Sequence, residues 1–250
     1  MSELTLAPPL VGRCLRISMR QIDALFTAVA LPIMMMLMFV YLFGGALHVG
    51  MKYVTYVVPG VLLVCAAFGA AMTAVSVSHD LNGGIMDRFR AMDVPATSII
   101  GGHVVASVLR NTFSTALVFG VAFAVGFRSS ADAGRWLAAL GVLMAFVFAL
   151  SWLSAAIGLL AKSPESANGF TFFVSFVPYL SSAFVPIATM PSWLHGVAGH
   201  QPATPVADSV RGLLLDRPVG DDPWIALAWS GGMLVCSMVL SAMLFRRRTG

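Results

Sequence analysis

Long apolar stretches separated by short polar segments divide this chain of 250 residues. A membrane-spanning helix needs about 20 mostly apolar residues. Runs without Asp, Glu, Lys or Arg cover residues 24–51, 53–79, 111–127, 136–161, 166–207 and 223–245. The pattern predicts six transmembrane helices. We place them near residues 25–46, 54–78, 107–127, 136–161, 168–188 and 224–245.

Composition agrees with a membrane protein, because 58% of the residues are apolar and 10% are charged, against about 25% charged in soluble domains. The fifth run is too long for a single crossing, and its second half is rich in Pro, Gly and His. Only the first half should cross. We therefore expect an all-α integral membrane protein with six transmembrane helices.

The chain is expected to form one transmembrane domain, residues 1–250. Within it we expect an interfacial segment (1–24), a pair of spans (25–78), a cytoplasmic loop (79–97) and a second pair of spans (98–161). The fifth span with an outer segment (168–223) and the sixth span with a basic tail (224–250) follow.

Basic residues predict the orientation, since Lys and Arg favour cytoplasmic loops. With a cytoplasmic N-terminus, nine of the 15 lie inside and five outside, and Arg110 falls within a span. Both termini are therefore expected in the cytoplasm of a multi-pass protein of the cell membrane. Arg13, Arg16 and Arg20 fit either a helix lying on anionic lipid or simple positive-inside anchors.

Several kinds of chemistry lack the residues they require. All 11 carboxylates fall in loops or at the ends of spans, which disfavours an ion-coupled carrier. The segment AAIGLLAKS has Ala156 and Ala161 where an ATP-binding phosphate loop needs glycine. The histidines are scattered and the three cysteines show no pairing or metal spacing. We predict no catalytic residue, no metal site and no cofactor on this chain.

Arg110 is the one charge expected inside a span. A buried cation there would indicate an anionic substrate or a partner residue. With its helix beginning near residue 107, the favoured interpretation is a side chain that extends to the cytoplasmic interface, close to His103.

The segment HDLNGGIMDRFRAMD, residues 79–93, concentrates charge between the second and third spans. Leu81, Ile85, Phe89 and Met92 recur at helical spacing, and the charged residues lie largely off this stripe. The pattern predicts a short amphipathic cytoplasmic helix. It could be a docking surface or a solvated connecting helix, and composition alone favours the second.

The same segment, continued as DLNGGIMDRFRAMDVPATS, resembles the loop between spans two and three of ABC type-2 export permeases, particularly the daunorubicin-resistance branch. The matching places are Asp80-Leu81, Gly84-Ile85, the run from Asp87 to Arg90, and Met92, with Asp93 where proline is usual. A second similar stretch follows span five, LSSAFVPIATMPSWLHGVAGHQPATPVADSVRGLL. Its family-like positions include Pro186, Pro191, Trp193, Pro202, Thr204 and Arg211.

The resemblance implies a permease subunit of an ATP-driven exporter. It implies a second permease copy or a related permease, and two cytoplasmic ATPase subunits that hold ATP and Mg. It also implies short re-entrant helices on the outer side after span five. The loop would then be a coupling helix that fits a cleft on the ATPase. Its candidate residues are Asp80, Leu81, Ile85, Asp87, Arg88, Phe89, Arg90 and Met92.

The family's cargoes are amphipathic drugs, antibiotics, lipids and glycans. Flexible Met and aromatic side chains suit such cargo, although lipid-facing or core packing explains the same residues equally well. The candidate path residues are Met35, Phe39, Phe68, Met72, Phe172, Phe176 and Tyr179. The alternative function is an ATP-independent membrane protein, either a gradient-driven carrier or a scaffold subunit. An integral membrane enzyme has no assembled catalytic set.

Overall fold

A computed structural model describes residue 12 and residues 22–45, 50–84 and 96–249 of the chain. Every regular element in these ranges is helical. The long helices are α2 (Ile22–Met38), α3 (Tyr53–Asn82), α5 (Ala96–Val125), α6 (Ala133–Leu160) and α10 (Asp222–Thr249). The shorter helices are α7 (Pro164–Phe176), α8 (Ser192–Gly199) and α9 (Ala203–Leu214). Short π and 3₁₀ turns cover Phe39–Phe43, Val177–Leu180 and Ile187–Thr189.

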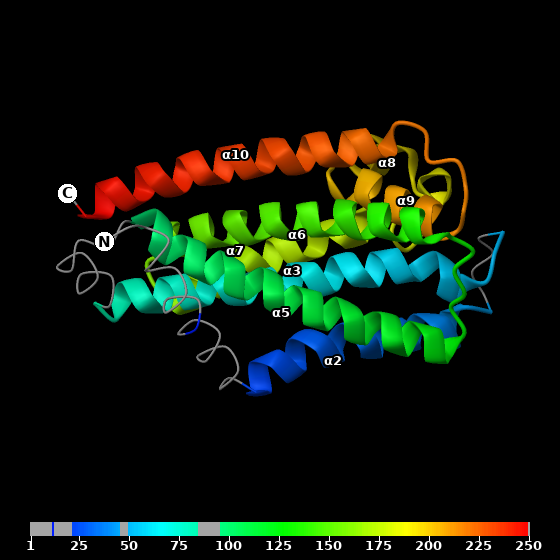
Figure 1. Cartoon of the computed structure of the whole chain (residues 1–250), viewed down its shortest axis with the longest axis horizontal. Helices are drawn as coiled ribbons and strands as arrows, with labels where there is room; N and C mark the ends of the chain where they lie inside the picture. The colour runs from blue at the N-terminus through cyan, green and yellow to red at the C-terminus, as the bar shows by residue number, and fades with distance from the viewer. Residues whose placement is uncertain (1–11, 13–21, 46–49, 85–95, 250) are drawn as a thin grey trace.

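The long helices run side by side along the longest axis, and α8 and α9 gather at one end (Figure 1). Helix α3 begins at that end and terminates at the other, α5 returns, and α6, α7 and α10 continue the alternation. We call the end that carries α8 and α9 the α9 end, and the opposite one, where α3 terminates, the Asp80 end.

Helix α3 lies at the centre of the bundle. Of its most apolar window 78% is buried, compared with 22% for α10. Val57, Val58 and Leu62 are fully buried in a core to which α5, α6, α7 and α9 also contribute or pack. An α-helix that is apolar on all faces is expected in such an interior position.

Local sequence explains where several helices begin and end. The Asp132 carboxylate accepts a hydrogen bond from the Arg135 amide at 2.7 Å and caps α6. Ser163 and Ser166 cap α7 reciprocally, with Pro164 in the first turn. Helix α3 ends before Gly84, whose φ of +67° favours glycine.

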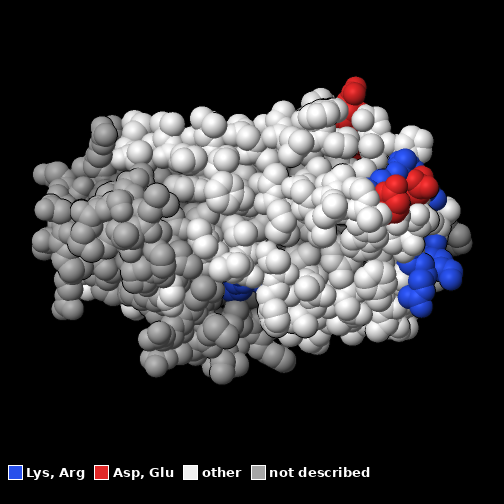
Figure 2. Space-filling model, viewed as in Figure 1, with Lys and Arg blue, Asp and Glu red and all other residues white. Residues whose placement is uncertain are grey.

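The prediction of an all-helical membrane protein is confirmed. Over the described residues, four helices are long and apolar enough to cross a membrane, Tyr53–Asn82, Ile99–Val125, Ala133–Leu160 and Asp222–Leu244, and Val29–Phe43 is a shorter apolar helix. Among the described residues on the face shown in Figure 2, the Lys, Arg, Asp and Glu atoms lie at the α9 end, apart from one recessed blue area near the middle. The six-span count and the orientation remain predictions.

Two predicted helices have different bounds. The third is predicted at 107–127, but α5 begins at Ala96. The prediction starts too late because Arg110 interrupts the charge-free run. In the folded chain the helix continues through Arg110, since α3 provides acceptors for its side chain. The fifth was placed at 168–188, but α7 ends at Phe176 and a 3₁₀ turn ends at Leu180. Pro178 lacks the backbone donor that a continuing α-helix requires.

Candidate functional site

The predicted coupling segment starts in the last turn of α3. Asp80 and Leu81 lie in that turn, before the helix ends at Asn82. The other candidate residues of the segment lie outside the described residues, namely Ile85, Asp87, Arg88, Phe89, Arg90 and Met92. The structure therefore places the start of the loop at the Asp80 end, and α5 leaves from the same end.

The helical pattern predicts that Asp80 lies on the polar face of an amphipathic helix, but in the structure this side chain is buried. It is 5% exposed, and its Oδ2 lies 3.2 Å from Nε2 of His103 on α5, itself 6% exposed. The sequence pattern assigns Asp80 to a separate amphipathic helix, but in the structure α3 continues through this residue and ends at Asn82, so that Asp80 faces α5. A buried carboxylate needs such a partner.

Five of the seven candidate path residues form one connected row. The Tyr179 hydroxyl donates to Sδ of Met35 at 3.0 Å, which joins the segment after α7 to α2. The Tyr179 ring stacks on Phe184 at 5.1 Å between centroids, and Phe184 contacts Phe39 at 5.2 Å.

The row continues from Tyr179 back along α7. Phe176 lies 5.7 Å from Tyr179 and 4.8 Å from Phe172 between ring centroids. Phe172 and Phe176 are exposed. We call Met35, Phe39, Phe172, Phe176, Tyr179 and Phe184 the aromatic row. Phe68 and Met72 lie on α3, half-buried, and Phe68 packs against the main core.

Arg211 on α9 holds the α9 end together. It is 8% exposed. Its Nε donates to the Tyr56 carbonyl at 3.2 Å, and Nη2 donates to the carbonyls of Ser182 and Ala183 at 2.9 and 3.3 Å. Its Nη1 pairs with Asp208, and its guanidinium lies 3.9 Å from the Tyr56 ring centroid. One cation thus joins α3, α9 and the segment after α7.

Two tyrosine hydroxyls complete this arrangement. Tyr56 donates to the Ser182 carbonyl at 2.7 Å, and Tyr53 donates to the Phe184 carbonyl at 3.1 Å. The Ser182 hydroxyl donates to Asp208 at 2.8 Å. We call Arg211, Tyr53, Tyr56, Ser182 and Asp208 the Arg211 clamp.

The other residues of the second family-like stretch shape the chain around the clamp. Pro186 precedes a 3₁₀ turn, Pro191 precedes α8, and Pro202 precedes α9. Thr204 accepts a hydrogen bond from the Ser182 amide at 3.3 Å and donates to the Ala198 carbonyl. Trp193 is 75% exposed.

The sequence reading missed the tyrosines and Asp208 as members of the clamp. Tyr56 and Arg211 are 155 positions apart, and their hydrogen bond uses a backbone carbonyl. No spacing in the sequence reports such a contact. The sequence offered one signal for this cluster: the Ser181–Ser182 pair and Arg211 belong to the same family-like stretch.

Arg110 lies at the middle of α5, and its side chain contacts the neighbouring helix α3, whereas the favoured interpretation had it extend to the cytoplasmic interface. Its Nη2 donates to the Gly69 carbonyl of α3 at 2.8 Å and lies 3.1 Å from the Thr73 hydroxyl. Because α5 begins 14 residues before Arg110, the start of the helix is about 20 Å away at 1.5 Å per residue. The acceptors on α3 are much closer.

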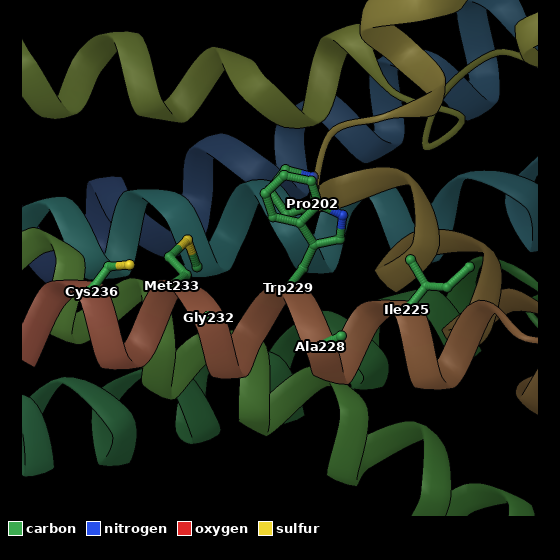
Figure 3. A pocket seen from close by; sticks show the side chains of 7 residues that line it. All are labelled: Pro202, Ile225, Ala228, Trp229, Gly232, Met233 and Cys236. Carbon is green, nitrogen blue, oxygen red and sulfur yellow. The ribbon is translucent and has the colours of Figure 1, made fainter.

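An apolar recess of about 580 Å³ opens on the side of α10 (Figure 3). Its lining is almost entirely apolar and comes from α10 and the start of α9: Pro202, Ile225, Ala228, Trp229, Gly232, Met233 and Cys236. None of these side chains belongs to the aromatic row. A recess with so little polar lining on a helix long enough to cross a membrane suits an acyl chain or another apolar group.

Within the described ranges there is no group of three or more His, Cys, Asp or Glu side chains that could hold a metal ion. His195 and His200 each contact a nearby carbonyl, Met190 and Gly196, at 2.9 Å. The polar groups described above fix helices to one another.

Comparison with known proteins identifies relatives along most of the chain. Residues 10–215 match the ABC-2 type transporter family. The chain is 29% identical, over 90% of its length and 80% of the relative's, to the daunorubicin resistance ABC transporter permease protein DrrB1 of Streptomyces coeruleorubidus. It is 23% identical, over 88% of its length and 80% of the relative's, to the probable doxorubicin resistance ABC transporter permease protein DrrC of Mycobacterium tuberculosis. The chain, a multi-pass protein of the cell membrane, therefore belongs to the ABC-2 type transporter family.

Proposed function

We propose that this chain is the transmembrane permease subunit of an ATP-driven exporter. Two separate cytoplasmic ATPase subunits hold ATP and Mg and carry out hydrolysis, and a second permease copy or a related permease completes the complex. Membership of the ABC-2 family and similarity to permeases of ABC transporters support this assignment. The Asp80 end then faces the cytoplasm, and the α9 end faces outwards.

The observation that best supports a coupling route is the path of α3 through the bundle. Helix α3 starts in the Arg211 clamp at Tyr53 and Tyr56 and ends at Asn82, beside the loop that leads to α5. Its 30 residues span about 45 Å at 1.5 Å per residue. A force on the loop reaches the outer segment through this one buried helix.

The loop at 79–97 is proposed to dock on an ATPase subunit. Leu81, Ile85, Phe89 and Met92 supply an apolar stripe, and Asp87, Arg88 and Arg90 supply its polar rim. This layering is usual at protein interfaces. Asp80, which contacts His103, supports the loop from within the bundle.

The cargo is proposed to be an amphipathic drug, antibiotic, lipid or glycan-type molecule that passes along the aromatic row. The relatives are named for daunorubicin and doxorubicin resistance, which favours the drug class. Exposed Phe172 and Phe176 and the thioether of Met35 present an adaptable apolar surface. The outward Arg211 clamp adjoins the same row through Phe184.

Docking is tested with Phe89→Ala combined with Arg90→Glu. We expect at least a tenfold loss of ATPase co-purification, because the substitutions remove an apolar anchor and reverse a charge at the interface. The measurement is ATPase recovered per tagged permease in mild detergent. Arg217→Ala, an exposed site at the opposite end, is the matched control. Unchanged assembly and ATP hydrolysis in the double variant would remove the docking role.

The cargo path is tested with Met35→Ala combined with Phe176→Ala. We expect daunorubicin, used as a probe, to lose most of its stimulation of ATP hydrolysis, while basal hydrolysis stays within about twofold. Phe113→Ala is the control, since Phe113 is 65% exposed on α5 and lies outside the row. Equal stimulation in all three proteins would show that the aromatic row does not contact the probe.

A further inference from the structure

Helices α3 and α5 carry paired polar contacts at two levels of one antiparallel interface. Asp80 contacts His103 at 3.2 Å, and Arg110 reaches Thr73 at 3.1 Å and the Gly69 carbonyl at 2.8 Å. Seven residues separate Thr73 from Asp80, and seven separate His103 from Arg110. The two levels therefore lie about 10 Å apart along both helices.

Close packing fixes the helices between and beyond these contacts. Asp80, His103 and Thr73 are all buried. A Cβ added at Gly69 would lie 2.1 Å from Oδ1 of Asn111, so α5 approaches the α3 backbone at the Arg110 level. Sliding one helix past the other would separate a buried carboxylate and a cation from their partners, which is costly in an apolar interior.

We propose that Asp80, His103, Thr73 and Arg110 form an α3–α5 brace that makes the two helices flanking the coupling loop move as one rigid unit. These are positioning residues: they act through the helices and contact neither ATP nor cargo. The inference rests on the proposed function, and it identifies which residues transmit the motion of the loop.

The geometry gives the brace a mechanical role. Helix α3 enters the loop at its Asp80 end, and α5 leaves the loop there. A push on a loop between two unconnected helices can spread them apart and leave their far ends in place. With contacts at two levels, the same push displaces both helices together, and α3 delivers the motion to the Arg211 clamp. Coupling then uses a contiguous packed element.

The test measures the α3–α5 distance in the assembled complex with its ATPase subunits. Spin labels are placed at His79→Cys and Val105→Cys, exposed positions on α3 and α5, after replacement of Cys14, Cys65 and Cys236. Distances are read by electron paramagnetic resonance without nucleotide and with ATP. The Asp80 level of the brace is removed by Asp80→Leu with His103→Leu, which replaces both side chains of that pair so that neither is left buried without the other. Asp80→Asn, which retains a side chain able to contact His103, is the conservative variant.

With the brace intact and in Asp80→Asn, we expect the distance to stay constant when ATP is added. In the double Leu variant we expect ATP to lengthen it by at least about 2 Å, the backbone radius of a helix, while ATPase co-purification remains and cargo-stimulated hydrolysis falls at least fivefold. A constant distance and full stimulation in the double variant would overturn the proposal, as would an ATP-dependent change in the intact protein. Failure of the proposed function itself would appear earlier, as a wild-type chain that purifies without an ATPase.

Discussion

The Arg211 clamp and the α3–α5 brace hold opposite ends of the same helix by different means. At the α9 end, one guanidinium donates to backbone carbonyls of Tyr56, Ser182 and Ala183 and also pairs with Asp208. At the Asp80 end, side chains of α3 and α5 meet at two levels, Asp80 with His103 and Arg110 with Thr73. The clamp joins three segments through one side chain, so its loss should weaken the fold, whereas the loss of contacts between two neighbouring helices should leave the fold intact and change the transmission.

Removing Arg211 should have the largest effect on stability. Arg211→Met removes one donor from each of three carbonyls and the cation from Asp208, so we expect a loss of about 3–5 kcal/mol. The measurement is the unfolding free energy in detergent, together with the amount of protein in the membrane. Arg217→Met, at an exposed position, should change the unfolding free energy by no more than about 0.5 kcal/mol and leave the amount of protein in the membrane unchanged. If Arg211→Met were as stable as the wild-type protein, the clamp would not be needed for the fold, and the proposed difference between the clamp and the brace would be wrong.

Gly69→Ala should have an intermediate effect, because the new methyl group overlaps the Asn111 amide at 2.1 Å. We expect about 1–3 kcal/mol of destabilisation from overpacking, with α3 and α5 forced apart. Gly120→Ala on α5 meets nothing within 4 Å and should be neutral or stabilising by up to about 1 kcal/mol. The two variants are compared by thermal unfolding under identical conditions. Equal midpoints would show that the helices do not approach each other closely at Gly69.

The ion pair between Arg135 and Asp216 should matter least. Its atoms are 2.9 Å apart, but the side chains are 39% and 54% exposed, so Arg135→Ala is expected to cost less than about 1 kcal/mol. Chemical denaturation with and without added salt is the measurement, and the difference should shrink as salt rises. A loss as large as that of Arg211→Met would mean that the difference in exposure between Arg135 and Arg211 does not decide what each contributes to stability.

The apolar pattern predicted the helical class and the approximate bounds of α3, placed at 54–78 and found at Tyr53–Asn82, because a long charge-free run is typical of a helix in lipid or in an apolar core. The same rule failed at Arg110, which ended a run although α3 supplies its acceptors, and at Asp80, which pairs with a histidine 23 positions away. Motif resemblance located Arg211 and Thr204. It could not find Tyr53 or Tyr56, whose partners are backbone carbonyls more than 120 positions away. Pairing across helices depends on register, which only the folded chain defines.

Affinity purification of the tagged wild-type chain from its own membrane tests the central claim most directly. We expect a subunit with a phosphate-loop motif to be recovered in equal amount and to hydrolyse ATP. We also expect vesicles that contain the complex to move daunorubicin only when ATP is supplied on the side of the Asp80 end. A chain that purifies without such a subunit and moves the probe equally well without ATP would contradict the account.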